Sequence, residues 1–249
     1  MVIKKRSGFL FSFLLLLAGC TTVNHISKTD VKYTVVKSDA ASEDAEVNAI
    51  IAPYKAQLDA VMNEVLIVLP VELTKQKPES TLGNWVSDVI TERLRKEGYE
   101  VDLAIVNYGG LRVPYLSPGP VTRGEIFELA PFDNLLMIVD VPGHKLDSVF
   151  HMIAESDGWP VSSEVNLFVK DKMVNSLKIS GQPVVADKIY KLATLDYVAN
   201  GGDNMKMLIP LDRKQTTLVF RDVLIDYLKD LNAVGKEFKP TLDGRISRL

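Results

Sequence analysis

The segment from residue 101 to residue 112 constrains the fold of this chain more than any other stretch. It begins with the short apolar and β-branched run Val101–Val106, which is typical of a buried strand. The polar hexamer Asn107–Arg112 follows at once and contains the adjacent glycines Gly109 and Gly110. Adjacent glycines allow positive φ and a close approach of a ligand or of another chain segment. We therefore expect a buried strand whose end forms the floor of a site.

Asn107 and Arg112 give this loop its chemistry. Asn107 offers an amide, and Arg112 offers a guanidinium whose fixed fork of donors fits a carboxylate or a phosphate. The alternative interpretation is an ordinary strand-to-loop turn with an exposed arginine, because short Gly-Gly motifs often occur without a ligand. The loop by itself is compatible with both interpretations.

The N-terminus has the features of an export signal. Three basic residues, Lys4–Arg6, precede the apolar run Gly8–Leu17, which is shorter than the roughly 20 residues needed to span a membrane. Leu17–Cys20 resembles a bacterial lipobox, in which the cysteine is lipidated and becomes the first mature residue. Cys20 is the only cysteine, so it cannot form a disulfide within the chain. We expect a signal peptide over residues 1–19 and an exported lipoprotein with a membrane anchor.

The residues after the cysteine indicate a tether and then one domain. Thr21 stands where an aspartate would indicate inner-membrane retention, so the lipobox resemblance favours the outer membrane of a Gram-negative cell, on its periplasmic or surface face. Residues 20–43 are rich in Ser, Thr, Lys, Asp and Ala, which suits a flexible spacer. Residues 44–249 are expected to form the folded domain.

The charge balance argues against a nucleic-acid partner. The chain has 29 Lys and Arg against 32 Asp and Glu, and the signal peptide contains basic residues but no acidic ones. The mature protein is therefore acidic, which gives no support for a surface that binds nucleic acid or anionic lipid. Any site for a phosphate group must be local.

Periodicity predicts an α+β domain. Apolar residues at three- and four-residue spacing predict helices over residues 44–64, 82–96, 146–153 and 217–231, and a short helix after Val121. Apolar and β-branched runs predict strands over residues 65–69, 101–106, 135–141, 165–169, 176–179 and 190–194. Helices and strands mix without a strict βαβ order, which favours α+β over a doubly wound sheet.

Two further polar stretches adjoin predicted strands. Pro131–Asn134 comes just before one strand and Tyr197–Asp203 just after another, and each places an aromatic ring beside amide or carboxylate groups. Two aromatic faces can hold a planar heterocycle, an amide can bind its edge, and a carboxylate can accept sugar hydroxyls. Taken singly, Phe132 is as readily a core residue and Asn134 a turn residue, and Gly-Gly-Asp is commonly a tight turn.

The order of the motifs is more informative than any one of them. Asn-x-Gly-Gly-x-Arg, Pro-Phe-x-Asn, Tyr-x-x-x-Gly-Gly-Asp and the terminal Gly244–Ile246 follow one another, after Leu82–Asn84 at the start of the second predicted helix. This order resembles the C-terminal domain of the periplasmic and cell-surface 5′-nucleotidases over about residues 44–249. The resemblance implies a layered α+β fold with mixed sheets and a site for a nucleoside or a nucleoside 5′-monophosphate.

The resemblance also implies roles for the residues that would hold the nucleoside. Phe132 and Tyr197 match the two aromatic rings that enclose the nucleobase, although the second ring is commonly phenylalanine. Asn134 matches a residue at the edge of the base. Asp203 matches the acceptor of the ribose hydroxyls.

A second group of residues matches positions around the phosphate. Asn107 and Arg112 correspond to groups near the phosphate, and Gly109 and Gly110 to the glycines that let the backbone approach. Family members also place an arginine shortly before the Leu-Gly-Asn helix start, where this chain has Lys-Gln-Lys-Pro-Glu at residues 75–79. The phosphate contact is thus weakened or passes to a lysine, which lacks the bidentate fork of arginine.

The largest departure from the family is the missing catalytic half. Full-length members carry an N-terminal metallophosphoesterase domain in which Asp, His and Asn residues hold two metal ions. The three histidines of this chain, His25, His144 and His151, lie in none of the patterns that such a site uses. We expect no catalytic residue, metal site or cofactor here, and divalent metals only in a separate metallophosphoesterase protein.

Three functions stay open. The leading hypothesis is the substrate-specificity half of a split 5′-nucleotidase. The second is a stand-alone nucleoside-binding receptor for scavenging. The third is a structural relic without a ligand, against which the joint presence of Phe132, Tyr197, Asn134 and Asp203 argues.

Overall fold

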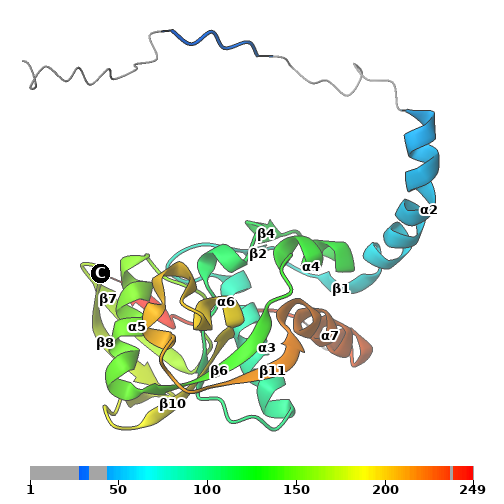
Figure 1. Cartoon of the computed structure of the whole chain (residues 1–249). Helices are drawn as coiled ribbons and strands as arrows, with labels where there is room; N and C mark the ends of the chain where they lie inside the picture. Colours follow the sequence, from blue (N-terminus) through cyan, green and yellow to red (C-terminus); the bar gives the residue numbers. More distant parts are fainter. Residues whose placement is uncertain (1–27, 34–43, 236–237, 249) are drawn as a thin grey trace, which may run out of the picture. The chain divides into compact units, whose positions relative to one another are not determined.

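The structure is a computed structural model that describes residues 28–33, 44–235 and 238–248 (Figure 1). The predicted signal peptide, Cys20 and most of the predicted tether lie outside these residues. The chain divides into two compact units, residues 1–48 and 49–249. Among the described helices, none is both long and apolar enough to cross a membrane.

The helices lie close to where periodicity predicts them. Ser80 accepts a hydrogen bond from the Gly83 amide at 3.0 Å and so caps α3, while Gly98 takes φ +83° beyond the end of this helix. The helices of the described part are α2 (Ala45–Met62), α3 (Thr81–Lys96), α4 (Arg123–Leu129), α5 (Gly143–Glu155), α6 (Asp196–Ala199) and α7 (Phe220–Ala233), with the 3-10 turns η1 (Tyr108–Gly110), η2 (Gly202–Asn204) and η3 (Lys206–Leu208).

The strands form mixed sheets, which confirms the predicted fold class. The main sheet has the order β11 (Arg213–Val219), β6 (Leu135–Pro142), β10 (Ile189–Leu195) and β3 (Leu103–Ala104). The second sheet has the order β12 (Ile246–Arg248), β7 (Val165–Lys170), β8 (Met173–Ile179) and β9 (Gln182–Pro183). Two antiparallel pairs complete the set, β1 (Val65–Leu69) with β5 (Gly119–Thr122) and β2 (Leu73–Thr74) with β4 (Tyr115–Leu116).

The register of the main sheet brings three loops to one edge. β6 and β10 are antiparallel, and Leu136 near the start of β6 pairs with Leu195 at the end of β10. β3 is parallel to β10, so its carboxyl end points the same way. The loop before β6 and the loops after β10 and β3 therefore meet at the same edge of the sheet.

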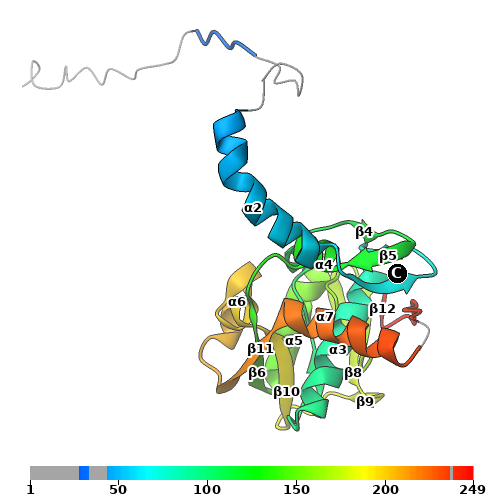
Figure 2. The same ribbon diagram turned by 90° about the vertical axis from the view of Figure 1, so that its right-hand side faces the viewer.

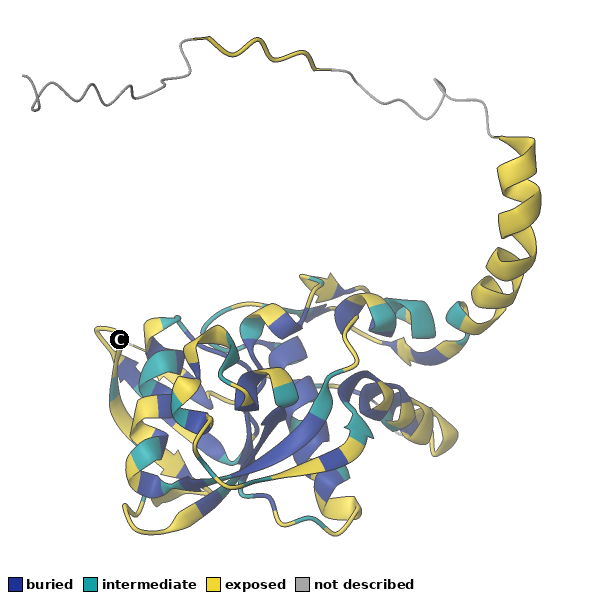
Figure 3. Ribbon diagram, viewed as in Figure 1, coloured by how far each residue is buried: buried dark blue, intermediate teal, exposed yellow. Residues whose placement is uncertain are grey.

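The core lies around the main sheet and its helices. Most residues of β6 and β10 are buried (Figure 3). The helix α5 packs on β6 and β8, and α3 and α7 lie side by side (Figures 1 and 2). Burial of the strands on both faces explains why they are continuous apolar runs in the sequence.

Two predicted elements differ from the structure in type or in most of their length. The last helix was expected from residue 217, but residues 213–219 form the edge strand β11 and the helix begins at Phe220. Pairing with β6, reinforced by the Thr216 hydroxyl that donates to the Leu136 carbonyl at 2.8 Å, keeps this segment extended. The strand expected over 101–106 is reduced to Leu103–Ala104 and one antiparallel bridge at Ile105, because the amide of Val106 bonds to Pro160 instead.

The helix α2 is confirmed, but none of its residues is buried (Figure 3). Its large apolar side chains are exposed, namely Val47, Ile50, Ile51, Tyr54, Leu58 and Val61. Ion pairs hold Glu64, the second residue beyond its end. The carboxylate of Glu64 pairs with Lys229 at 2.6 Å and with Arg123, and these two side chains hold the pKa of Glu64 below its usual value.

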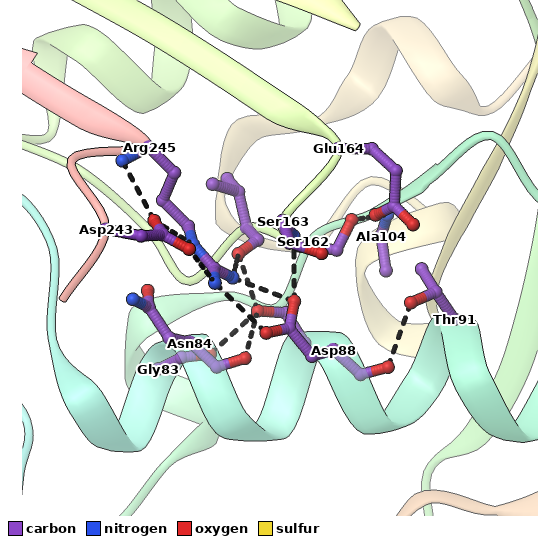
Figure 4. Close-up of polar contacts among 12 residues, drawn as sticks. Gly83, Asn84, Asp88, Thr91, Ala104, Ser162, Ser163, Glu164, Asp243 and Arg245 are labelled. Atoms are coloured by element: carbon purple, nitrogen blue, oxygen red, sulfur yellow. Dashed lines mark hydrogen bonds and ion pairs between the residues drawn. The ribbon is translucent and has the colours of Figure 1, made fainter. Parts of the chain in front are cut away.

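A buried guanidinium joins the C-terminus to α3 (Figure 4). Arg245 is 3% exposed and contacts both carboxylates on either side of it, with Nη1 and Nη2 2.8 and 3.0 Å from the oxygens of Asp88 and Nη2 2.7 Å from Asp243. Its Nη1 also donates to the Val161 carbonyl at 2.9 Å. Hydrogen bonds from Arg245 lower the pKa of Asp243, whereas burial raises that of Asp88.

The Leu82–Asn84 motif serves the same junction. The Asn84 side chain donates to Glu79 at 2.7 Å and to the Thr241 carbonyl at 2.9 Å. Glu79 in turn accepts from the amides of Asp243 and Gly244 at 2.9 and 3.0 Å. The start of α3 and the terminal Gly-Arg-Ile motif are thus two halves of one structural contact.

We predict that Arg245→Met lowers the free energy of unfolding by about 2–3 kcal/mol, because it leaves two carboxylates and a carbonyl without their donor. The cost stays below that of a fully buried pair because both carboxylates reach solvent. Urea unfolding followed by tryptophan fluorescence measures it. Arg248→Met is the control, since its exposed pair with Asp157 at 3.9 Å is worth at most about 1 kcal/mol. Equal losses in the two variants would contradict the assigned role of Arg245.

Candidate ligand site

One cavity of about 300 Å³ opens at the edge where the three loops meet. All the residues that the sequence singled out as a site line it, although they come from separate parts of the chain. They are Asn107, Gly109, Gly110, Arg112, Phe132, Asn134, Tyr197 and Asp203. The first four follow β3, the next two precede β6 and the last two follow β10.

Two aromatic rings stand half-exposed in the cavity lining. Phe132 is 49% exposed and Tyr197 is 48% exposed, so neither is the core residue of the alternative interpretation. The ring of Tyr197 lies against Gly202, where an added Cβ would come within 2.4 Å of the ring. Only glycine at residue 202 leaves room for the ring in this position.

Asn134 lies between the Phe132 wall and the sheet. Its backbone carbonyl accepts a hydrogen bond from the Phe220 amide at 2.9 Å, which fixes the residue at the start of β6. Its side-chain amide makes no hydrogen bond to the described residues. The amide donors and acceptor are thus available on the cavity wall.

Asp203 accepts two hydrogen bonds from the cavity wall. Nδ2 of Asn107 donates to one carboxylate oxygen at 2.7 Å, and the hydroxyl of Tyr197 donates to the other at 3.1 Å. The backbone of Asp203 is left-handed, with φ +49°, and Gly201 before it has φ +91°. A left-handed aspartate is uncommon, and the two donors oppose the cost of that conformation.

Asn107 is 5% exposed and directs its amide to Asp203. The resemblance implies a place near the phosphate for Asn107, whereas in the structure its amide donates to the carboxylate of Asp203. Its Oδ1 is buried without a hydrogen-bond partner among the described residues, and an added Cβ on Gly110 would lie 2.6 Å from it. Gly110 therefore makes room for the Asn107 amide as well as lining the cavity.

Three cations gather beside the cavity. Arg112 donates to the Gly109 carbonyl at 3.2 Å, and its Cζ lies 5.7 Å from the centre of the Phe132 ring. Lys75 and Lys77 place Nζ 4.3 and 4.6 Å from the ring centre of Tyr108. Burial and the charges of Arg112 and Lys77 lower the pKa of Lys75. None of the three forms an ion pair with a described residue, so their positive charges can attract an anion.

Tyr108 is a residue that sequence reasoning missed. It occupies the variable position of the Asn-x-Gly-Gly motif, and its ring holds both lysine ammonium groups. The available signal in the sequence was an aromatic residue in the same loop as Arg112, since aromatic rings and cations often lie together.

The described residues do not fit a two-metal centre. No group of three or more His, Cys, Asp or Glu side chains in the described ranges is arranged to hold a metal ion. Nδ1 of His151 lies 2.8 Å from the Asp147 carbonyl within α5, and Nδ1 of His144 lies 3.3 Å from the Ala186 carbonyl. We therefore derive no hydrolytic step from these side chains.

Comparison with known proteins agrees with the geometry. Residues 64–209 match the family described as 5′-nucleotidase, C-terminal domain. Protein UshA of Yersinia enterocolitica is 26% identical over 219 residues, which cover 80% of this chain and 39% of that protein. Protein UshA of Escherichia coli K12 is 27% identical over 182 residues, covering 70% of this chain and 32% of that protein.

A solved structure has the same fold. A 5′-nucleotidase precursor from Thermus thermophilus superposes with a TM-score of 0.70 at 24% identity, over 85% of this chain and 44% of the other. The chain thus spans less than half the length of each of these relatives. Because the family match covers more than half of its residues, the chain belongs to the 5′-nucleotidase C-terminal domain family.

Proposed function

We propose that this protein is a lipid-anchored nucleotide- or nucleoside-binding domain. It supplies substrate specificity to a 5′-nucleotidase activity whose metal-dependent half is a separate polypeptide. The observation that carries the proposal is the cavity that brings two half-exposed aromatic rings together with Asn134 and Asp203. The anchor is Cys20, and the protein acts outside the inner membrane, at the outer membrane.

Each part of the cavity suits one part of a nucleotide. The nucleobase stacks between Phe132 and Tyr197, where its π-face meets aromatic surface on both sides. The free amide of Asn134 binds the edge of the base, and the carboxylate of Asp203 accepts from the sugar hydroxyls.

The phosphate lies toward the cation cluster of Arg112, Lys75 and Lys77. These side chains have no ion-pair partner among the described residues, so a phosphate dianion gains their charge without breaking an existing pair. Binding energy from the base and sugar then places the phosphate for chemistry performed by the partner.

The partner docks on α2. Its exposed apolar side chains would be covered by an apolar face of the metal-binding half, and large exposed apolar surfaces commonly mark such contacts. The relatives support this choice of occupant, because more than half of their length lies outside the part that this chain matches. The ion pairs of Glu64 with Arg123 and Lys229 hold the residue that follows the carboxyl end of α2 on the domain.

The second candidate function is a stand-alone nucleoside receptor. It is favoured by the fact that both rings and the sugar acceptor come from this chain, so nucleoside binding needs no partner. Calorimetric titration with adenosine and with its 5′-monophosphate separates the two functions. Preference for the monophosphate supports the specificity half, and equal affinity supports the receptor.

We predict that Phe132→Ala weakens adenosine binding by about tenfold or more, since one stacked aromatic ring contributes roughly 1–3 kcal/mol per base. The control is Tyr115→Ala, which removes a similarly exposed ring outside the cavity and leaves the affinity unchanged. Calorimetry on the purified proteins gives both values. An unaltered affinity in Phe132→Ala would remove this ring from the binding site.

Arg112→Ala should weaken binding of the 5′-monophosphate by about tenfold or more, because hydrogen bonds to charged groups contribute roughly 1.5–3 kcal/mol. The affinity for adenosine, which has no phosphate, should change little. Titration of both ligands at one fixed salt concentration measures the difference, since screening changes it. If both ligands lose equally, the guanidinium does not contact the phosphate.

We predict that a metallophosphoesterase-domain protein encoded beside this one gains nucleotidase rate or substrate affinity when the two are mixed. Leu58→Asp on α2 should abolish the gain without altering adenosine binding, because it puts a charge on the apolar face. Ala56→Asp, at an exposed residue on the opposite side of the same helix, is the control that keeps the gain. No gain on mixing the unaltered proteins would refute the split arrangement.

A further inference from the structure

We propose that Tyr197 and Asn107 make Asp203 a selective acceptor for the paired hydroxyls of a ribose, so that the site discriminates against deoxyribose. This inference rests on the proposed nucleoside binding. It assigns a specificity role to a hydroxyl and an amide that need not touch the ligand themselves, since both act through Asp203.

The hydrogen bonds occupy one position on each carboxylate oxygen. Asn107 Nδ2 lies 2.7 Å from Oδ2, and the Tyr197 hydroxyl lies 3.1 Å from Oδ1. A carboxylate has about four lone-pair sites on its two oxygens. Each oxygen therefore keeps a position for one more donor. Two neighbouring sugar hydroxyls match two such positions, whereas a sugar lacking one hydroxyl leaves one of them empty.

The orientation of the carboxylate is set from three separate elements. Asn107 caps η1 after β3, Tyr197 belongs to α6 and Asp203 to η2. The Asn107 amide cannot reverse without loss, because its Oδ1 would then face the carboxylate, and two acceptors repel each other. Gly110 leaves room for that Oδ1, because an added Cβ on residue 110 would lie 2.6 Å from it, and Asn107 is only 5% exposed. The donor is therefore held in place by packing as well as by hydrogen bonding.

Tyr197 links the two halves of the nucleoside site. Its ring lies against Gly202 and forms a wall for the base, while its hydroxyl holds the sugar acceptor. Tyr197→Phe removes only the hydroxyl and keeps the ring, so base stacking and sugar selection can be separated by one substitution. This makes Tyr197→Phe the decisive variant.

The test is calorimetric titration of the purified protein with adenosine, 2′-deoxyadenosine and 2′,3′-dideoxyadenosine. The unaltered protein should bind adenosine about tenfold or more tightly than the dideoxy compound, as expected when two hydrogen bonds to a charged acceptor are lost. Tyr197→Phe should reduce this ratio at least threefold. Phe132→Ala is the matched control, because it weakens all three ligands by a similar factor and keeps the ratio.

Asn107→Asp tests the second positioning residue through pH. It places a second carboxylate beside Asp203, and the two can share a proton only as pH falls. Adenosine binding to Asn107→Asp should therefore tighten from pH 7 to pH 5, while dideoxyadenosine binding changes little. Arg112, the other charged side chain in the cavity lining, is common to both proteins. A merely structural role for Asn107 would weaken binding at every pH without this recovery.

The possible results distinguish failure of this inference from failure of the proposed nucleoside binding. Nucleoside binding with an undiminished ratio in Tyr197→Phe, or a flat pH profile in Asn107→Asp, overturns the inference and leaves the proposed function intact. Absence of binding by all three nucleosides to the unaltered protein overturns both.

Discussion

The buried guanidinium of Arg245 is the interaction on which the ligand site depends. A charge in the interior must be paired, so Asp88, Asp243 and the carbonyl of Val161 converge on it. That contact holds residues 160–162 against residues 104–106, where Ser162 exchanges hydrogen bonds with Ala104 and the Val106 amide donates to Pro160. Asn107 is the next residue along. The contact made by Arg245 thus helps to set the position of the loop Asn107–Arg112 in the cavity lining.

The two ends of the cavity are prepared differently. At one end, Asp203 already accepts hydrogen bonds from the protein and is held in one orientation. At the opposite end, Arg112, Lys75 and Lys77 crowd together without an anionic partner among the described residues, and burial with mutual repulsion lowers the pKa of Lys75. A carboxylate whose orientation is fixed by hydrogen bonds selects a ligand group by its geometry. Cations without an anionic partner select a ligand group by its negative charge. This asymmetry fixes which way round a nucleotide would lie in the cavity.

The sequence predicted which residues line the cavity but not how they contact one another. Phe132, Tyr197 and their polar neighbours were identifiable because their motifs adjoin apolar strands in a recognisable order. The bond from Asn107 to Asp203 spans 96 residues, and only the register of β3, β6 and β10 brings the two together. Residues 217–219 fit helical periodicity, and pairing with β6 decided their conformation. The motif Gly244–Ile246 was visible in the sequence, but the role of Arg245 was not, because that role depends on packing between distant segments.

The exposed helix α2 has a thermodynamic consequence. The helix contains Pro53 and buries none of its residues, whereas most helices in proteins are stabilised by packing of an apolar face. Any surface that covers α2 would therefore order the helix while it removes apolar area from water. Both processes give association a negative heat-capacity change, larger than the covered area alone would produce. The affinity of this protein for a partner would then depend strongly on temperature, in a way that nucleoside binding in the cavity would not.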